Sequence, residues 1–295
     1  WTKTNTIGSY SMVEWNTDNS RYEMSVLGFK VHSVFQSISR SDKTVFGYEA
    51  LCRIEMQGER VNIKRFFKIL EGFGEKAEFR FKFYLNIMHL RNFRNSNIYS
   101  RDVKLFLNLT PCFFKYFSIG DDLTKLYLPL IKEENVDLKQ IVVEIVEDYC
   151  PISDIESLHK GTEYLKSLGI SFALDDFGTG WSGYSRMAVV QPNYIKVSRD
   201  MLVEFGMNQP QEDNLLAELN AITSLQGITV IFEGIENIEN YNVAAQYGAD
   251  FFQGYYLDIP KTYPVTIATK DIPKPVNKFQ LNSYLDKMSI ISTRV

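Results

Sequence analysis

Short apolar runs alternate with longer amphipathic segments through the middle of the chain. Runs that are rich in Val, Ile and Phe and bounded by turn residues are typical of buried strands. They cover residues 44–48, 104–107, 140–143, 171–174, 194–197, 229–232 and 250–252. Apolar residues recur at helical spacing, with a glycine close behind, over residues 155–168, 212–225 and 238–247. Because repeated strand–helix units form parallel sheets, we expect an α/β protein, and this pattern alone fits an open sheet or a closed barrel.

A polar or charged side chain lies at or just beyond the end of each of these strands. These residues are Glu49, Asn108, Glu144, Asp175 with Asp176, Lys196, Glu233 and Gln253. An open sheet would spread them along one edge, because neighbouring strands lie about 4.8 Å apart. In an eight-stranded barrel all the strand ends meet around one mouth, where the active sites of barrel enzymes lie. The pattern therefore favours an α/β barrel with a functional site at its mouth.

The adjacent carboxylates of Asp175 and Asp176 are the most informative part of this pattern. Neighbouring carboxylates repel each other and lose hydration unless a cation or hydrogen bonds offset the cost. Just past a strand end, with Gly178 and Gly180 freeing the turn, the pair can converge on one site. That arrangement suits a divalent metal ion. A helix N-cap is the simpler alternative, although one aspartate is enough for a cap.

Composition limits the class of protein. The chain has 295 residues, of which 45% are hydrophobic, so it can form one large domain or two small ones. Its net charge of −4 argues against a nucleic-acid polymer as partner and leaves room for a small anionic ligand. Residues 73–97 alternate Phe with Lys and Arg, as base-stacking surfaces do. Given the acidic total, we interpret them as an amphipathic strand or helix with solvated charges.

Cysteine usage and hydropathy indicate the compartment. Cys52, Cys112 and Cys150 form no CxxC pair and are odd in number, which fits the reducing cytoplasm. No apolar run approaches the roughly 20 residues of a membrane helix. The first residues also lack the basic-then-apolar pattern of a signal peptide. We therefore expect a cytoplasmic domain, and attachment to a membrane through sequence outside this chain stays open.

The predicted strand ends also carry a set of motifs. They are YEALCR at 48–53, FLNLTP at 106–111, VEIVED at 143–148, LDDFGTG at 174–180, YIKVS at 194–198, FEGIEN at 232–237 and QGYYLDIP at 253–260. In this order they resemble the motifs of the EAL-domain cyclic-di-GMP phosphodiesterases, and LDDFGTG is identical to the central motif of that family. The resemblance covers about residues 30–262. It leaves residues 1–29 as an N-terminal extension and 263–295 as a C-terminal tail, with a short helix expected at 279–288.

The resemblance implies a modified TIM-type (β/α)8 barrel that hydrolyses cyclic-di-GMP to linear pGpG with two Mg²⁺ or Mn²⁺ ions. It also implies that a homodimer is common, often through the region around the DDFGTG loop. Matched residue by residue, the metal ligands are Glu49, Asn108, Glu144, Asp175 and Asp176. The catalytic residues are Lys196, Glu233 and Gln253, and the substrate-binding residues are Arg53, Glu49 and Leu51. Glu147 and Glu236 support loops or are simple surface charges.

These residue types suit phosphodiester hydrolysis. Oxygen ligands favour hard cations, and two cations about 3.5–4 Å apart can activate a water and stabilise the phosphate charge. Asp175 is the expected bridge between them. Lys196 can orient the attacking hydroxide and Glu233 can accept its proton. The Arg53 guanidinium can bind two phosphate oxygens at once.

The chain departs from the family pattern at three places. Val146 stands where threonine is usual, Ser198 where aspartate is frequent, and Trp181-Ser182-Gly183 where Tyr-Ser-Ser is frequent. These departures bear on loop support and rate and remove none of the expected metal ligands. The alternative function is a catalytically weak EAL-like module that binds cyclic-di-GMP or a protein partner. Such a module would be expected to lose metal ligands or the base, and this chain keeps them.

Overall fold

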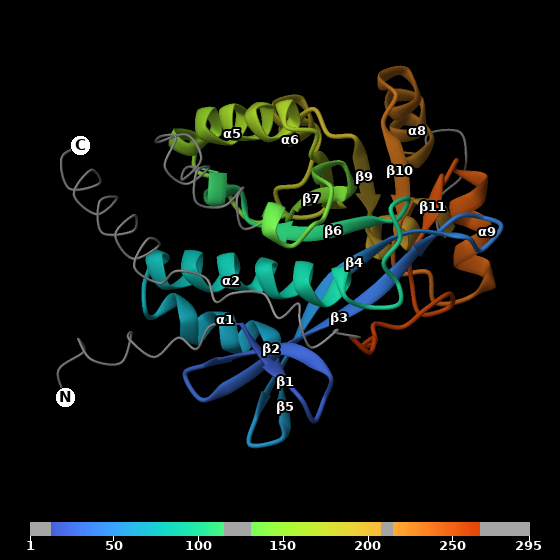
Figure 1. Cartoon of the computed structure of the whole chain (residues 1–295). Helices are drawn as coiled ribbons and strands as arrows, with labels where there is room; N and C mark the ends of the chain where they lie inside the picture. Colours follow the sequence, from blue (N-terminus) through green and yellow to red (C-terminus); the bar gives the residue numbers. More distant parts are fainter. Residues whose placement is uncertain (1–12, 115–130, 208–214, 266–295) are drawn as a thin grey trace.

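The computed structural model of the chain describes residues 13–114, 131–207 and 215–265. Within them, eight strands close into a barrel in the order β3–β11–β10–β9–β8–β7–β6–β4, and pairing of β3 with β4 completes the ring (Figure 1). The barrel strands are β3 (Phe29–Ser39), β4 (Val45–Met56), β6 (Lys104–Leu109), β7 (Ile141–Ile145), β8 (Ser171–Phe177), β9 (Tyr194–Val197), β10 (Thr229–Phe232) and β11 (Phe251–Phe252). The α/β barrel expected from the sequence is therefore confirmed.

One strand distinguishes this barrel from a regular TIM barrel. Strand β3 runs antiparallel to both of its neighbours, with Gln36 opposite Glu49 on β4 and Ser39 opposite Phe252 on β11. The other barrel strands pair in parallel. The apolar pattern of the sequence did not indicate this strand. Strands β1 (Glu14–Asn16), β2 (Arg21–Val26) and β5 (Glu59–Val61) extend the sheet beyond the barrel beside β3 and β4.

Helices surround the barrel (Figure 1). They are α1 (Ile63–Glu71), α2 (Glu75–Arg94), α5 (Ile155–Ser167), α6 (Tyr184–Val190), α7 (Arg199–Met201), α8 (Leu215–Gln226) and α9 (Ile238–Gln246). Shorter turns are η2 (Pro111–Phe114), η3 (Leu138–Gln140), η4 (Ile152–Asp154) and the π-type η5 (Leu202–Met207). The three helices expected from apolar spacing are present, and α8 is described from Leu215 onward. The short helix expected at residues 279–288 lies outside the described residues. No helix in the described ranges is both long and apolar enough to cross a membrane.

The stretch of alternating Phe and basic residues forms α2, a helix rather than a strand. Phe79, Phe81 and Phe83 are all buried, so the helix is not a simple solvated surface element. The expectation of solvated charges is wrong for Arg91, which is 2% exposed. Its Nε donates to Oε1 of Glu134 at 2.6 Å, and a buried charge of this kind is tolerated because it is paired.

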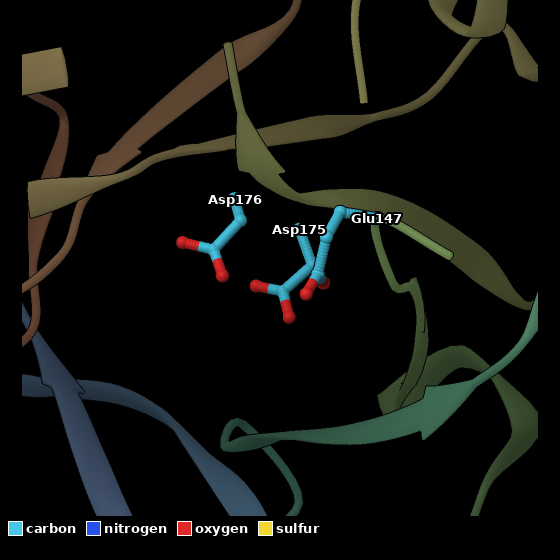
Figure 2. Close-up of side chains that lie close together, drawn as sticks. All are labelled: Glu147, Asp175 and Asp176. Atoms are coloured by element: carbon cyan, nitrogen blue, oxygen red, sulfur yellow. The ribbon is translucent and has the colours of Figure 1, made fainter. Parts of the chain in front are cut away.

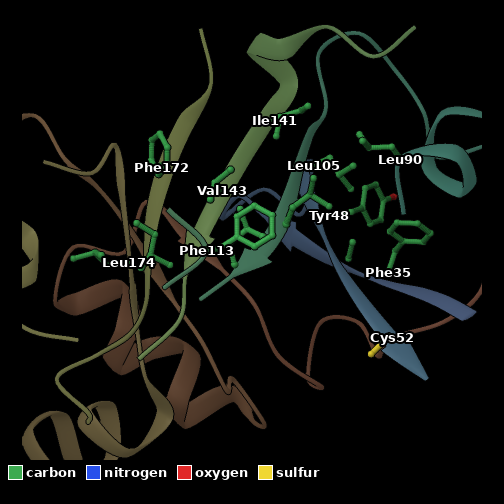
Figure 3. Close-up of a cluster of buried hydrophobic side chains, with 14 of the residues drawn as sticks. Phe35, Tyr48, Cys52, Leu90, Leu105, Phe113, Ile141, Val143, Phe172 and Leu174 are labelled. Carbon is green, nitrogen blue, oxygen red and sulfur yellow. The ribbon is translucent and has the colours of Figure 1, made fainter. Parts of the chain in front are cut away.

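Alternation along the strands divides the core into two layers. Leu105, Val143 and Phe172 point out of the barrel and pack with the surrounding helices (Figure 3). The residues between them point inward. The inward cluster comprises Ile38, Phe106, Val142, Ala173 and Ile231, with Phe46, Tyr194 and Phe251 packed against it. The rings of Phe46 and Phe251 stack with centroids 3.9 Å apart, so the barrel interior has an apolar floor.

Candidate metal centre at the barrel mouth

The polar residues of the site form the layer directly above this apolar floor. Two residues after Phe106, Val142, Ala173, Tyr194 and Ile231, in turn, come Asn108, Glu144, Asp175, Lys196 and Glu233. A step of two residues keeps a side chain on the same face of a strand and moves it toward the carboxyl end. The strand pattern therefore directs these side chains inward and places them at one level of the barrel.

The sequence predicts these residues at or just beyond the ends of the strands, and most of them lie inside the strands. Strand β6 continues to Leu109 and β7 to Ile145, and Asn108 is paired with Glu144 in the ladder. The strands continue because backbone pairing does not depend on whether the side chain is polar. Glu233 and Gln253 do follow directly after β10 and β11.

The ammonium of Lys196 lies among four carboxylates. Its Nζ is 2.7 Å from Oε1 of Glu144, 3.1 Å from Oδ1 of Asp175 and 3.2 Å from Oε2 of Glu49, and it also contacts Oε1 of Glu233. Lys196 is 1% exposed and Glu144 is fully buried. Burial alone would lower the pKa of this lysine, but the surrounding carboxylates raise it well above its usual value. The four carboxylates therefore favour the protonated, cationic form of Lys196.

Glu49 is the carboxylate with the most hydrogen bonds in the group. Asn108 Nδ2 donates to its Oε1 at 2.9 Å, and Gln253 Nε2 donates to its Oε2 at 2.6 Å. Burial acts to raise the pKa of Glu49, but Lys196 and these amide donors outweigh it, so the pKa lies below its usual value. Glu49 is thus an anion in the folded protein.

For the remaining carboxylates, the single charge of Lys196 does not outweigh the effect of burial on the pKa. Burial, together with the charge of Glu49, raises the pKa of Glu144 well above its usual range. Burial also raises the pKa of Glu233 and of Asp175, although Lys196 opposes the shift in both. One ammonium cannot neutralise four carboxylates, so the site has an excess of negative charge that a proton or a metal cation must offset.

A second group of carboxylates adjoins the first. Ligand atoms of Glu147, Asp175 and Asp176 all lie within 4.8 Å of one another. Figure 2 shows these side chains side by side, from β8 and from the segment that follows β7. Burial, followed by the charge of Asp175, raises the pKa of Asp176 to about 6. Asp175 belongs to both groups and is the residue that joins them.

The local backbone explains how two adjacent aspartates reach one site. They lie within β8, not after it, at an irregularity in the pairing with β9 between Leu174 and Phe177. Asp176 has a φ of 45°, in the left-handed region, which Asp tolerates better than most residues. An extended strand would direct the two side chains to opposite faces, and this bulge turns both toward the mouth.

The donor set fits a hard divalent cation. Oε2 of Glu144 and Oε1 of Gln253 are buried and accept no hydrogen bond from a described residue, whereas Oε1 of Glu144 and Oδ1 of Asp175 lie against the Lys196 ammonium. Buried oxygens without donors are costly. Carboxylate and amide oxygens are the ligands that Mg²⁺, Mn²⁺ and Ca²⁺ prefer. The residues that could hold such an ion are Glu49, Asn108, Glu144, Asp175, Asp176 and Glu147.

Three of the predicted residues lie apart from the carboxylates. Leu51 and Arg53 lie two and four residues after Glu49 and therefore on the same face of β4. Arg53 is partly buried, and its Nη1 donates to the carbonyl of Cys52 at 3.1 Å. Glu236 pairs with Arg199 at 2.8 Å, with both side chains about half exposed. Leu51 and Arg53 are positioned along the wall of the mouth, whereas Glu236 forms a surface ion pair.

Sequence reasoning missed two contributors to the site. Gln36 on β3 accepts a hydrogen bond from Gln253 Nε2 at 3.2 Å and is buried, but its strand had not been expected. The sequence predicts Glu147 as a loop support or a surface charge, and its carboxylate lies in the second group. Its position three residues after Glu144 was the available signal.

The departures from the family pattern have local structural roles. Ser198 is the N-cap of α7, and its Oγ accepts a hydrogen bond from the backbone N–H of Met201 at 3.2 Å. Serine therefore supplies the cap that an aspartate also can. Trp181 is 62% exposed, and its ring lies 4.9 Å from that of Tyr149.

The fold and this site together define an α/β-barrel protein with a buried, oxygen-rich candidate cation site. The family model described as EAL domain matches residues 23–260, and the chain belongs to that family. The resemblance seen in the sequence motifs is thereby confirmed.

Individual relatives are similar at low identity. YkuI, an uncharacterised EAL-domain-containing protein of Bacillus subtilis (strain 168), is 26% identical over 255 residues, which are 85% of this chain and 59% of YkuI. The cyclic di-GMP phosphodiesterase TpdA of Vibrio parahaemolyticus is 26% identical over 154 residues, covering 52% of this chain and 25% of TpdA. The chain thus spans about three fifths of the length of YkuI and a smaller share of TpdA.

Solved structures share the fold. The crystal structure of YkuI in complex with cyclic-di-GMP and calcium has a TM-score of 0.65 at 24% identity and covers 90% of this chain and 62% of that one. The structure of Klebsiella pneumoniae BlrP1 with manganese and cyclic-di-GMP has a TM-score of 0.65 at 21% identity and covers 85% of this chain and 58% of that one.

Proposed function

We propose that this chain hydrolyses cyclic-di-GMP to linear pGpG with Mg²⁺ or Mn²⁺. The observation that carries the proposal is the set of buried carboxylates around Lys196 at the barrel mouth, together with the adjoining Glu147 and Asp176. It is supported by TpdA, which is named as a phosphodiesterase for this nucleotide. YkuI and BlrP1, which share the fold, were solved with cyclic-di-GMP and a divalent metal.

The side chains have distinct proposed roles in this reaction. Glu49, Asn108, Glu144 and Asp175 would hold one cation, and Asp175 and Asp176 would hold a second. When bound, the cations would lower the pKa of a water and offset the phosphate charge.

In the reaction, the oxygen of a water forms a bond to phosphorus and the bond from phosphorus to the ribose 3′ oxygen breaks. Glu233 accepts the proton of the water, for which a raised carboxylate pKa is suited. Lys196 holds the carboxylates in place and stabilises negative charge near the phosphate. Gln253 fixes Glu49 through its amide hydrogen bond. Arg53, farther along β4 with Leu51, binds a phosphate of the substrate.

The proposal extends to location and assembly. The cysteines Cys52, Cys112 and Cys150 are free thiols, which supports a reducing cytoplasm. Exposed apolar side chains next to the DDFGTG loop, Trp181 and Tyr184, support a homodimer through this region. Light scattering after size exclusion tests the dimer, and a monomer at micromolar concentration would argue against it.

A product assay tests the function. The purified chain is incubated with cyclic-di-GMP and Mg²⁺ or Mn²⁺, and products are resolved by chromatography, with EDTA as the metal-free control. We expect pGpG only when the metal is present. Absence of metal-dependent pGpG contradicts the proposal. Binding of cyclic-di-GMP without turnover, measured by calorimetry, would favour the alternative of a catalytically weak binding module.

A further inference from the structure

A buried arginine holds the segment that carries Glu147. Arg186 lies on α6 and is 7% exposed. Its Nη1 donates to the carbonyl of Val146 at 2.8 Å, and its Nη2 donates to the carbonyl of Asp148 at 2.6 Å. The residue between these two carbonyls is Glu147. A single guanidinium therefore fixes the backbone on both sides of one carboxylate of the second group.

Contacts from the DDFGTG loop hold Glu147 itself. The backbone N–H of Trp181 donates to the Glu147 carbonyl at 3.2 Å. Gly180 lies against the same residue with a φ of +50°, and a Cβ there would meet Glu147 Cγ and its carbonyl at 3.3 Å. Three consecutive carbonyls, those of Val146, Glu147 and Asp148, are thus all occupied as acceptors. The remaining freedom of this segment is that of the Glu147 side chain, which lies beside Asp175 and Asp176.

The chemistry of the guanidinium suits this role. Its planar arrangement of donors can reach two acceptors at fixed separation, whereas a lysine ammonium is a single point charge. Among the described residues, no carboxylate lies within salt-bridge distance of Arg186, so its hydrogen bonds go to main-chain carbonyls. Burying a cation without a carboxylate partner costs free energy. Backbone positioning accounts for its presence at this place.

We propose that Arg186 is a positioning residue of the metal site and that it acts through Glu147. By bridging the carbonyls of Val146 and Asp148, it sets the Glu147 carboxylate against Asp175 and Asp176. Arg186 also joins α6, which follows the DDFGTG loop, to the segment after β7. The distance between the segment that carries Glu147 and the segment that carries Asp175 and Asp176 is thereby held constant. The inference rests on the proposed metal site and not on turnover of the nucleotide.

Titration of the full chain with Mn²⁺, followed by electron paramagnetic resonance in the absence of nucleotide, tests the proposal. Arg186→Met is expected to weaken Mn²⁺ binding about 10- to 100-fold, as removal of outer partners of metal ligands does. Glu147→Gln is expected to weaken it by a similar factor. The decisive sample is the double variant. In the Glu147→Gln background, Arg186→Met should cause no further loss of Mn²⁺ affinity, because the carboxylate that Arg186 positions is already absent.

Two further variants keep the result interpretable. Arg186→Lys retains the charge and can reach one carbonyl only, so we expect a folded protein, checked by circular dichroism, with an intermediate loss of affinity. Lys166→Met is the matched control. Lys166 Nζ donates to the carbonyl of Val190 at the other end of α6, at 2.7 Å, and this variant should bind Mn²⁺ like the wild type.

The outcomes separate this inference from the proposed function. Unchanged Mn²⁺ affinity in both Arg186 variants overturns the inference. The inference is also overturned if Arg186→Met reduces Mn²⁺ affinity by the same factor in the wild type and in Glu147→Gln. A wild-type chain that does not bind Mn²⁺ overturns both proposals. A chain that binds Mn²⁺ with the expected coupling and fails to produce pGpG overturns the proposed function alone.

Discussion

The Nζ of Lys196 lies 2.7 Å from Oε1 of Glu144, and neither side chain is exposed by more than 1%. This ammonium is also in contact with Glu49, Asp175 and Glu233. A buried cation that is shared among several carboxylates links folding stability to metal binding, because either cation can offset the same negative charge.

Lys196→Met should therefore destabilise the metal-free protein. Removing one partner of a buried ion pair costs about 3–5 kcal/mol of unfolding free energy. Urea unfolding in EDTA measures this loss, and added Mn²⁺ should stabilise the variant more than the wild type. Lys166→Met, which removes a partly exposed lysine, serves as the control. Equal stability of Lys196→Met and wild type in EDTA would show that the carboxylates do not need this ammonium.

Asp175→Asn should weaken metal binding more than Asp176→Asn does. Asp175 is the member common to the Lys196 contacts and to the Glu147–Asp176 group. Loss of a direct ligand is expected to cost at least the roughly tenfold that an outer partner costs. Calorimetric titration with Mn²⁺ measures the affinity, and Glu156→Gln at the exposed end of α5 is the control. An unchanged titration of Asp175→Asn would rule out the bridging role.

Glu233→Ala should abolish turnover and keep part of the nucleotide binding. A positioned general base contributes about 10²–10⁴ in rate, so kcat is expected to fall by at least about 100-fold. Chromatography of pGpG gives kcat, and calorimetry gives binding of cyclic-di-GMP. Wild-type kcat in this variant would mean that another group accepts the proton.

His89→Gln should reduce the loss of stability in acid. Burial lowers the pKa of His89 to about 3, and its Nδ1 lies 2.8 Å from Ser33 Oγ. Because the unfolded histidine titrates near pH 6.5, its neutral burial stabilises the fold fully above that pH, and this contribution is lost as the pH falls toward 3.

The measurement is urea unfolding at pH 7 and pH 5. One histidine that takes up its proton only on unfolding changes the unfolding free energy by about 1.4 kcal/mol per pH unit. The drop between the two pH values should shrink by up to about 2 kcal/mol in His89→Gln. His32, whose pKa burial lowers to about 4, remains as the internal reference for the same effect. Identical pH dependence of variant and wild type would contradict the assignment.

The polar residues at the ends of the apolar runs were enough to predict much of the site. Phe106 and Asn108, or Ala173 and Asp175, differ by two positions, and that period by itself directs both side chains to one face of a strand. The family motifs lie at the ends of the same strands. The family and the barrel could therefore be predicted from short segments of sequence. These are properties of short segments, and they do not require knowledge of distant contacts.

Other features depend on contacts between segments far apart in the chain. The reversed strand β3 has no distinctive period, and it is held by pairing with β4 and β11. The buried ion pair of Arg91 with Glu134 joins residues 43 positions apart, so a basic stretch read as solvated proved to be partly core.

The sequence by itself determined the barrel, the gathering of polar residues at its mouth and the identity of most candidate ligands, because apolar runs and the motifs at their ends are local properties. Only the tertiary structure decided that Asp176 takes a φ of 45° and that Arg186 bridges the carbonyls around Glu147. Both features lie next to the place where Glu147, Asp175 and Asp176 meet. They depend on how β8, α6 and the segment after β7 pack together, and no local pattern of residues encodes that packing.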